Sequence, residues 1–409
     1  MKSKSFARLG ALALACAAAH AIAQPFDPQP YYLGIGQAFT HEDNLFRVAD
    51  GSPKTSETYS TTSLLAGVDQ PIGRQRFYAD GVVRHNRYRD VDTLNHTGYG
   101  LDVGLDWETI NRLSGRVAYT VNERLARFGL DEGPLVIDVP NEERTQQFLA
   151  RGKLGGESTL AIELLGLYRK LDYSAVQFAF REFDQTTGGL NVEYRPGGLL
   201  VLGAGVRLTQ GEYQALRDEF DRNDFDLTAV YTPSGLTKLS ARISYTDEEH
   251  DRTSARDLQG VTGALGWEYK PTGKLVFITE LIRDSGAETS FSATGFESAT
   301  PTGTSSRLTN LARLRVLYEA TAKIQLEGNL RYARRNLVST AVGTGGATAT
   351  EAGSDRTTEY ALGARYAATR NLLFACSIGT ERRKASANTT VSYPYSADRA
   401  SCSAQFVLQ

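Results

Sequence analysis

Apolar and polar residues alternate along most of the chain with the period of an extended strand. In residues 97–107 (TGYGLDVGLDW), one face carries Tyr99, Leu101, Val103, Leu105 and Trp107. Successive side chains of a strand point to opposite faces, so this pattern predicts a strand that is apolar on one side. The same alternation recurs in residues 113–122, 160–169, 239–246, 261–269, 314–318, 324–332 and 360–366.

The second face of these strands indicates the fold class. It carries Gly, Ala, Ser and Thr with single charges, instead of the long polar side chains of a solvent-exposed sheet. Strands of about ten residues with one apolar face and one small or charged face fit a transmembrane β-barrel, with lipid outside and water inside. The alternative is a soluble sandwich or propeller, whose strands are usually about 5–6 residues long.

Short and long connections alternate between the predicted strands. Turns with Pro, Gly or few residues are expected at Pro71–Arg74, Glu108–Arg112, Gly155–Glu157, Pro196–Gly198, Pro233–Gly235, Pro271–Gly273, Ala320–Ala322 and Thr369–Asn371. Long loops are expected at Glu42–Ser56, Arg127–Asn141, Asp172–Arg181, Gln214–Asn223, Ser285–Ser306, Val338–Asp355 and Lys384–Ala397. This arrangement predicts an all-β, antiparallel barrel of about eighteen strands over residues 31–409, with short periplasmic turns and long extracellular loops.

Aromatic residues provide a second indication of the same topology. Strands that run toward a short turn end in outward rings at Trp107, Tyr194, Tyr231, Trp267, Tyr269, Tyr318 and Tyr366. Strands that run the other way carry a ring higher up, at Tyr119, Tyr168, Tyr245 and Tyr332. Two such levels are expected at the two membrane interfaces, although Tyr and Trp also favour strands in general.

The N-terminus reads as an export signal. Residues 1–23 combine a basic start, an apolar run and the cleavage sequence Ala21-Ile22-Ala23, which is the order of a secretory signal peptide. We expect a mature chain from Gln24, with a short periplasmic segment at 24–30, in the outer membrane of a Gram-negative bacterium. Outer-membrane lipid is then the first expected partner.

Two cysteines remain after the predicted cleavage. Cys376 and Cys402 both fall on the outward faces of consecutive predicted strands, and their midpoint lies in the loop expected at 384–397. An exported chain meets oxidising conditions, so we predict that they form a disulfide. The alternative is two free, lipid-facing thiols, because cross-strand neighbours often have poor disulfide geometry.

The chain shows no catalytic signature. It has 45 Lys+Arg against 47 Asp+Glu, so no basic excess points to nucleic acid. No zinc spacing, nucleophile elbow or phosphate loop occurs, and we therefore expect no enzymatic activity, cofactor or metal. Two acidic clusters, Asp218–Asp224 and Asp247–Arg252, are interpreted as solvated loops; the alternative is that they bind divalent cations, or glycolipid phosphates through such cations.

Charged residues on the predicted inner face are the candidate site. A barrel of this strand number leaves an aqueous channel unless it is plugged, and its charges set selectivity. The alternative is a set of cross-strand ion pairs that stiffen the wall. Mixed sign suits a neutral or weakly charged solute such as a sugar chain. The candidates that line this path are Arg84, Asp102, Asp106, Arg116, Glu163, Arg169, Arg207, Arg242, Glu280, Arg315, Glu327, Arg331 and Arg365.

Several segments resemble a known family. Tyr31–Gly34, Phe39–Phe46, Ala66–Arg76, Leu94–Tyr99 and Gly104–Trp107 are similar to the EpsL-type outer-membrane barrels of exopolysaccharide biosynthesis and exosortase systems. The resemblance implies a pore for a saccharide chain, with other polysaccharide-export components as partners. It brings no catalytic residues. Such barrels commonly end on an aromatic residue, whereas this chain ends Phe406-Val407-Leu408-Gln409.

Three alternative functions remain open from the sequence. A general diffusion porin would carry an inward constriction loop, for which Ser285–Ser306 is the best candidate by length. An outer-membrane hydrolase would need a base such as His85, His96 or His250 beside an acid or a serine. A structural or adhesive barrel would work through its long loops.

Overall fold

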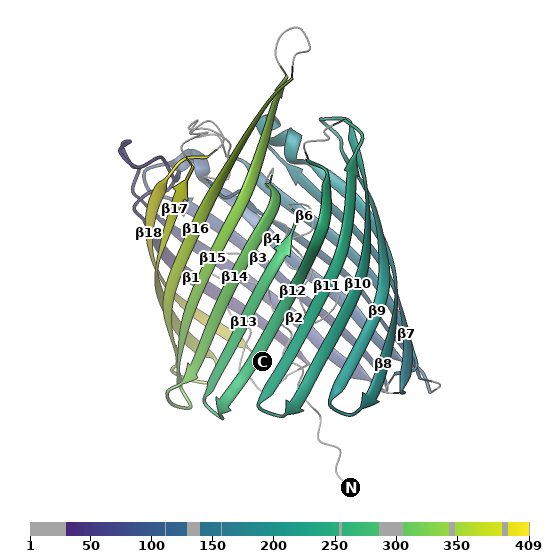
Figure 1. Ribbon diagram of the computed structural model, residues 1–409. Coiled ribbons are helices and arrows are strands. Elements are labelled where there is room, and N and C mark those ends of the chain that lie inside the picture. Colours follow the sequence, from purple (N-terminus) through teal and green to yellow (C-terminus); the bar gives the residue numbers. More distant parts are fainter. Residues whose placement is uncertain are drawn as a thin grey trace.

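Every strand pairs antiparallel with the next one along the chain, and the first strand also pairs with the last (Figure 1). The result is a closed barrel of eighteen strands, seen in a computed structural model, which confirms the predicted fold class and strand number. The structure describes residues 30–110, 112–128, 140–156, 158–252, 256–285, 306–342, 348–386 and 392–408. The predicted signal peptide and residues 24–29 lie outside these ranges.

The strands are mostly 12 to 17 residues long. Their bounds are β1 Tyr31–Glu42, β2 Glu57–Ile72, β3 Gln75–Tyr88, β4 His96–Glu108, β5 Leu113–Leu125, β6 Glu142–Leu154, β7 Leu160–Tyr173, β8 Phe183–Gly197, β9 Leu200–Tyr213, β10 Asp218–Ser234, β11 Thr237–His250, β12 Leu258–Thr272, β13 Leu275–Asp284, β14 Ser306–Glu319, β15 Ile324–Val342, β16 Thr348–Ala367, β17 Leu372–Ala385 and β18 Tyr395–Leu408. Short 3₁₀ helices, η1 Asp92–Leu94 and η2 Val176–Arg181, lie in two of the described connections. Among the described residues, no helix is long and apolar enough to cross a membrane.

Short turns gather at the end of the barrel at which β1 begins, and the longer connections gather at the other end (Figure 1). We refer to these as the periplasmic end and the mouth. Two predicted loops are wrong. β10 already begins at Asp218, inside the loop expected at 214–223, and residues 338–342 and 348–355 belong to β15 and β16. These two strands pair with each other as far as Val342 and Thr348 and rise above their neighbours in Figure 1.

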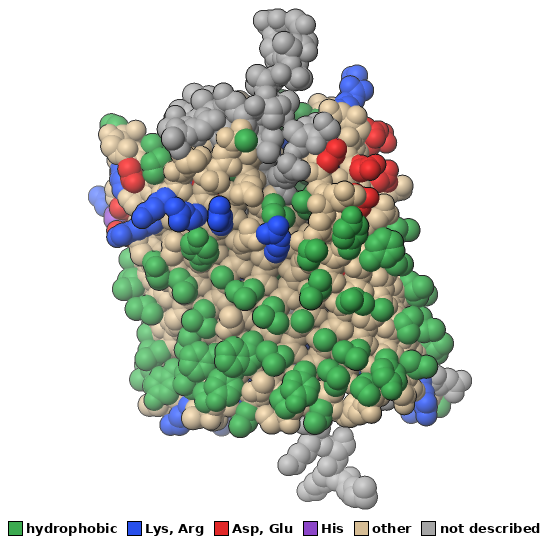
Figure 2. All heavy atoms as spheres, in the orientation of Figure 1, with side chains coloured by type: hydrophobic (Ala, Val, Ile, Leu, Met, Phe, Trp, Pro, Cys, Tyr) green, Lys and Arg blue, Asp and Glu red, His purple; other side chains and the backbone are tan. Residues whose placement is uncertain are grey.

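The two faces of the wall differ sharply in exposure. On β7, Ile162 and Leu164 are 46% and 60% exposed on the outside, whereas Glu163 between them is 7% exposed on the inside. Apolar side chains cover the middle of the outer wall (Figure 2). The predicted interface rings Tyr194, Trp267, Tyr318, Tyr366, Tyr168, Tyr245 and Tyr332 are among the exposed ones. An apolar outer band around a polar interior is typical of a membrane-spanning β-barrel.

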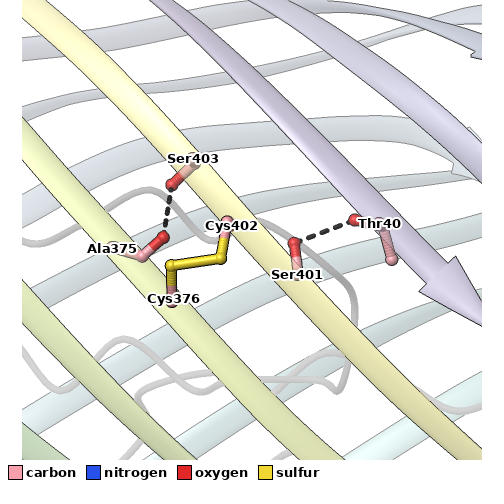
Figure 3. Close-up of a disulfide and its surroundings, with 6 residues drawn as sticks. All are labelled: Thr40, Ala375, Cys376, Ser401, Cys402 and Ser403. Atoms are coloured by element: carbon pink, nitrogen blue, oxygen red, sulfur yellow. Dashed lines mark hydrogen bonds between the residues drawn. A yellow bond between two sulfur atoms is a disulfide. The ribbon is translucent and has the colours of Figure 1, made fainter.

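Cys376 and Cys402 lie directly opposite each other on β17 and β18. Their Cα atoms are 4.1 Å apart and a disulfide joins them (Figure 3). The bond stands next to the seam at which β18 closes onto β1, where the hydroxyls of Thr40 and Ser401 are 2.9 Å apart. The last hairpin is therefore cross-linked beside the closure of the barrel.

Candidate functional site

All of the candidate residues from the sequence lie on strands of the wall, and most of them are ion-paired or hydrogen-bonded to a neighbour inside the barrel. Most of the candidate charges face a partner of opposite sign, in line with the alternative that these charges stiffen the wall. The pairs and their distances are Arg116–Asp106 2.6 Å, Arg207–Asp226 2.6 Å, Arg331–Glu359 2.6 Å, Arg315–Glu327 2.9 Å, Arg242–Asp284 3.2 Å, Arg313–Glu280 3.6 Å and Lys153–Glu163 3.9 Å.

The remaining candidates have other surroundings. Arg365 donates to the amide oxygen of Gln325 at 3.3 Å, and Asp102 accepts a bond from a threonine hydroxyl. Arg169 is 1% exposed and stacks on the ring of Phe183 at 5.9 Å. Arg84 makes no hydrogen bond or ion pair with any described residue. The candidates thus form several separate groups along the wall, not a single ring.

Arg222 is the centre of a buried group of charges on β10–β13. Its side chain is fully buried and donates to both carboxylate oxygens of Asp224, at 2.9 and 3.0 Å. It also donates to Glu248 at 3.1 Å, to Asp284 at 2.9 Å and to the hydroxyl of Ser285 at 2.7 Å. Every donor direction of this guanidinium is used, which is what makes a buried arginine tolerable.

Arg207 and Arg242 extend the group to its neighbours on β9 and β11. Arg207 approaches Asp224 at 3.3 Å as well as Asp226, and Arg242 donates to the hydroxyl of Ser244 at 2.8 Å. We call this set the lumen lattice; it consists of Arg207, Arg222, Arg242, Asp224, Asp226, Glu248 and Asp284. Its members are at most 6% exposed, so it forms a stiff inner wall.

The lumen lattice corrects the interpretation of the two acidic clusters as solvated loops. The first cluster lies wholly on β10 and the second lies on β11 as far as His250, and their strand residues alternate between the two sides of the wall. Asp224 and Glu248 face inward into the lattice, and His250 lies inside with its Nδ1 3.0 Å from a carboxylate oxygen of Asp218. A run of acidic residues in the sequence does not reveal this alternation, because charge alone does not distinguish a strand from a loop.

A second group of charges, the mouth network, joins two connections of the mouth to β16 and β17. Glu381 on β17 accepts from Arg47 at 3.1 Å and from Arg127 at 2.6 Å. Arg47 also donates to Glu42 at 2.6 Å, and Arg127 to Glu359 at 3.1 Å. Burial disfavours charge on Arg47, but these carboxylates outweigh it and hold the pKa of its guanidinium above the usual value.

Arg127 reaches across the mouth to make these contacts. It follows β5, whereas Glu359 and Glu381 lie on β16 and β17, seven and six strands away around the ring. Beside it, the rings of Phe46 and Phe128 pack edge to face with centroids 4.9 Å apart. The connections after β1, β3 and β5 share one apolar cluster, which contains Leu45, Phe46, Val48, Tyr59, Tyr88 and Leu94 with Val91, Leu125 and Phe128.

The sequence did not identify the mouth network. Arg47 and Arg127 lie in segments expected to be loops, and Glu359 and Glu381 were not chosen although they occupy inward positions. Their alternation with exposed neighbours such as Tyr360 was available as a signal. The expected constriction segment, Ser285–Ser306, lies almost wholly outside the described residues, so that expectation stays a prediction.

The described ranges contain no group of three or more His, Cys, Asp or Glu side chains arranged to hold a metal ion. His85 and His96, two of the bases considered for a hydrolase, pair with Thr97 and Asn86. Apolar side chains cover the outside of the barrel and networks of charge line its inside, which is typical of a barrel that spans a membrane. The chain is a β-barrel of the Gram-negative outer membrane.

Comparisons with known proteins add a likeness of chain path. No family model matches the chain, and no curated protein matches it. Among solved structures, the barrel is similar to the outer membrane protein opdK from Pseudomonas aeruginosa, with 15% identity, a TM-score of 0.47 and coverage of 92% of this chain and 98% of that one. It is also similar to OccAB3 from Acinetobacter baumannii, with 12% identity, a TM-score of 0.46 and coverage of 92% and 98%.

Proposed function

We propose that this barrel is a diffusion channel for small hydrophilic solutes across the outer membrane. The observation that carries the proposal is the mouth network, in which Arg127 crosses from the β5 side to Glu359 and Glu381. Ion pairs between distant parts of the ring divide the entrance and leave less room for a bulky polymer. An inner wall of paired charges below them suits small polar molecules.

The inner wall supports passage with little charge preference. Most candidate charges face a partner of opposite sign, so their fields largely cancel a few ångströms from the wall. The hypothesis that Arg84, Asp102 and the other candidates line the path is part of this proposal. No residue is assigned a catalytic role.

Export of an exopolysaccharide is the narrower alternative. It rests on the sequence resemblance, and neither the geometry nor the similar structures add support to it. If this function holds, a saccharide chain would pass the mouth network and other export components would dock on the barrel. The two functions differ in the size of the solute that passes.

Electrical recording tests the proposal directly. The mature chain, residues 24–409, is refolded and inserted into a planar bilayer, and single-channel currents are measured with and without polysaccharide fragments on one side. Liposome swelling with sugars of increasing length gives the size limit. We expect open channels that admit monosaccharides and disaccharides and are not blocked by long fragments. Block by long fragments would favour export, and the absence of conductance would contradict the pore itself.

A further inference from the structure

The outer wall carries a row of basic side chains near the mouth. Arg283, Asn310, Arg334, Arg356 and Lys384 are successive cross-strand partners on β13, β14, β15, β16 and β17. The four charged members are exposed, while the residues that flank them on each strand face inward. We call this set the basic row. Figure 2 shows blue side chains aligned along one side of the upper wall.

The basic row lies immediately above the lipid-facing band. Two positions nearer the membrane on the same outward face are Leu281 on β13 and Tyr332 on β15, which are 45% and 39% exposed. On β16, Tyr360 lies four positions beyond Arg356 toward the membrane, and its side chain is 52% exposed. Exposed Tyr rings mark the interface between hydrocarbon and headgroups, so the row stands at headgroup height in the outer leaflet.

No carboxylate of the described residues pairs with Arg334, Arg356 or Lys384. Among the described residues, Arg283 donates only to the carbonyl of Val261 and to the side chain of Asn310. Like charges directly opposite each other destabilise a sheet, and here Arg334, Arg356 and Lys384 stand in consecutive register. Arg382 adds a further exposed charge two positions below Lys384. Within the described part of the chain, the row therefore has no counter-anion.

The opposite sign is gathered on another sector of the wall. Asp221 on β10 and Glu249 on β11 are cross-strand partners, and both are exposed. Red side chains occupy the other upper side of the barrel in Figure 2. Asp398 on β18, opposite Thr380 of β17, is exposed as well, but no ion pair joins it to a described residue of the basic row.

We propose that the basic row binds the phosphate groups of a phosphorylated glycolipid in the outer leaflet. Adjacent strands lie about 4.8 Å apart, so two or three neighbouring side chains reach one phosphate. Arginine presents paired N–H donors that match phosphate oxygens. The position above an apolar band lets the acyl chains of the same molecule lie against Leu281 and its neighbours. This inference is independent of what the barrel transports.

Native mass spectrometry of the solubilised barrel tests the inference. The full mature chain is titrated with a bisphosphorylated hexa-acyl glucosamine disaccharide lipid, with its dephosphorylated form and with phosphatidylglycerol. A triple variant, Arg334→Gln, Arg356→Gln and Lys384→Gln, is compared with Arg87→Gln, which removes an exposed, outward arginine of β3 outside the row. We expect the triple variant to bind the phosphorylated glycolipid at least about tenfold more weakly and the Arg87 variant to bind like the native chain.

Further readouts separate the alternatives. Heat-modifiable gel mobility reports whether each variant folds, and the single variant Arg356→Gln carries the test if the triple variant does not. Inorganic phosphate alone should fail to displace the lipid at millimolar concentration, whereas high salt should weaken binding through screening. Equal affinity of the native chain and the folded variants, or equal affinity for the dephosphorylated lipid, would overturn the proposal. Preference for phosphatidylglycerol would overturn the assignment to a glycolipid.

Discussion

Glu381 holds two arginines that reach it from different connections of the mouth. Its two oxygens accept from Arg47 and Arg127, and the hydroxyl of Tyr395 donates to it at 2.6 Å. A glutamine has the same shape but no charge, so Glu381→Gln would remove the negative charge shared by two partly exposed guanidinium groups, Arg47 at 11% and Arg127 at 25%. We expect a loss of about 3 kcal/mol in the free energy of unfolding, with larger and noisier single-channel currents.

The matched control for this prediction is Glu327→Gln. Glu327 pairs with Arg315 at 2.9 Å, but both side chains are more exposed, at 18% and 30%. Its loss should cost less and leave the current noise unchanged. Identical currents for Glu381→Gln and the native chain would show that the mouth network does not narrow the pore.

Arg222 gives a second prediction at the residue scale. Arg222→Met removes the group that Asp224, Glu248 and Asp284 share and leaves their buried charges facing one another. Breaking a buried pair usually costs about 3–5 kcal/mol, so we expect a lower urea midpoint or failure to insert. The partly exposed Arg116→Met should cost about 0–1 kcal/mol. Equal midpoints for the two variants would contradict the structural role of the lumen lattice.

At the scale of elements, the disulfide cross-links the final hairpin beside the closing seam. Mass mapping without reductant should recover the peptides of Cys376 and Cys402 joined. Replacing both by alanine should lower the free energy of unfolding by about 3 kcal/mol, as expected for a loop of this length. Alkylation of both thiols in the native barrel would contradict the bond. Reduction of the native chain should reproduce the effect of the double substitution, whereas it should not change the alanine variant.

The period of two residues predicted the strands well because a membrane wall must keep one face apolar. The turns at 71–74 and 271–273 followed from the same alternation with Pro and Gly. Alternation does not extend to the part of a strand that leaves the membrane, because the upper parts of β15 and β16 need no apolar face and are rich in Ser, Thr and Gly. The pairing of β15 with β16 extends both strands, and amino-acid composition does not predict this pairing.

The mouth network was beyond prediction for a different reason. Arg127 and Glu381 are 254 residues apart in sequence and meet only because the ring closes and one connection turns inward. Alternation assigns a side chain to a face of the wall, but it does not specify its partner across the barrel. The same limit applied to the lumen lattice, where Ser285 of one connection meets Glu248 of β11.

At the scale of the whole molecule, opposite charges are arranged differently on the two sides of the wall. Inside, arginines and carboxylates alternate at hydrogen-bond distance, which stiffens the barrel and weakens its net field. Outside, near the mouth, the signs are separated into a basic and an acidic sector. Most of the paired charge therefore lies inside the barrel, whereas the basic row on its outer surface is unpaired among the described residues.

This arrangement predicts a channel with weak ion selectivity. In a KCl gradient across a planar bilayer, the reversal potential should stay well below half of the value for an ideally selective pore, because the lumen charges neutralise one another locally. Glu381→Gln removes one negative charge at the mouth and should shift the reversal potential toward anion preference. Arg356→Gln, on the outer wall, should leave it unchanged. A strongly selective native channel would mean that unpaired residues such as Arg84 govern permeation, and Arg84→Gln would then abolish the selectivity.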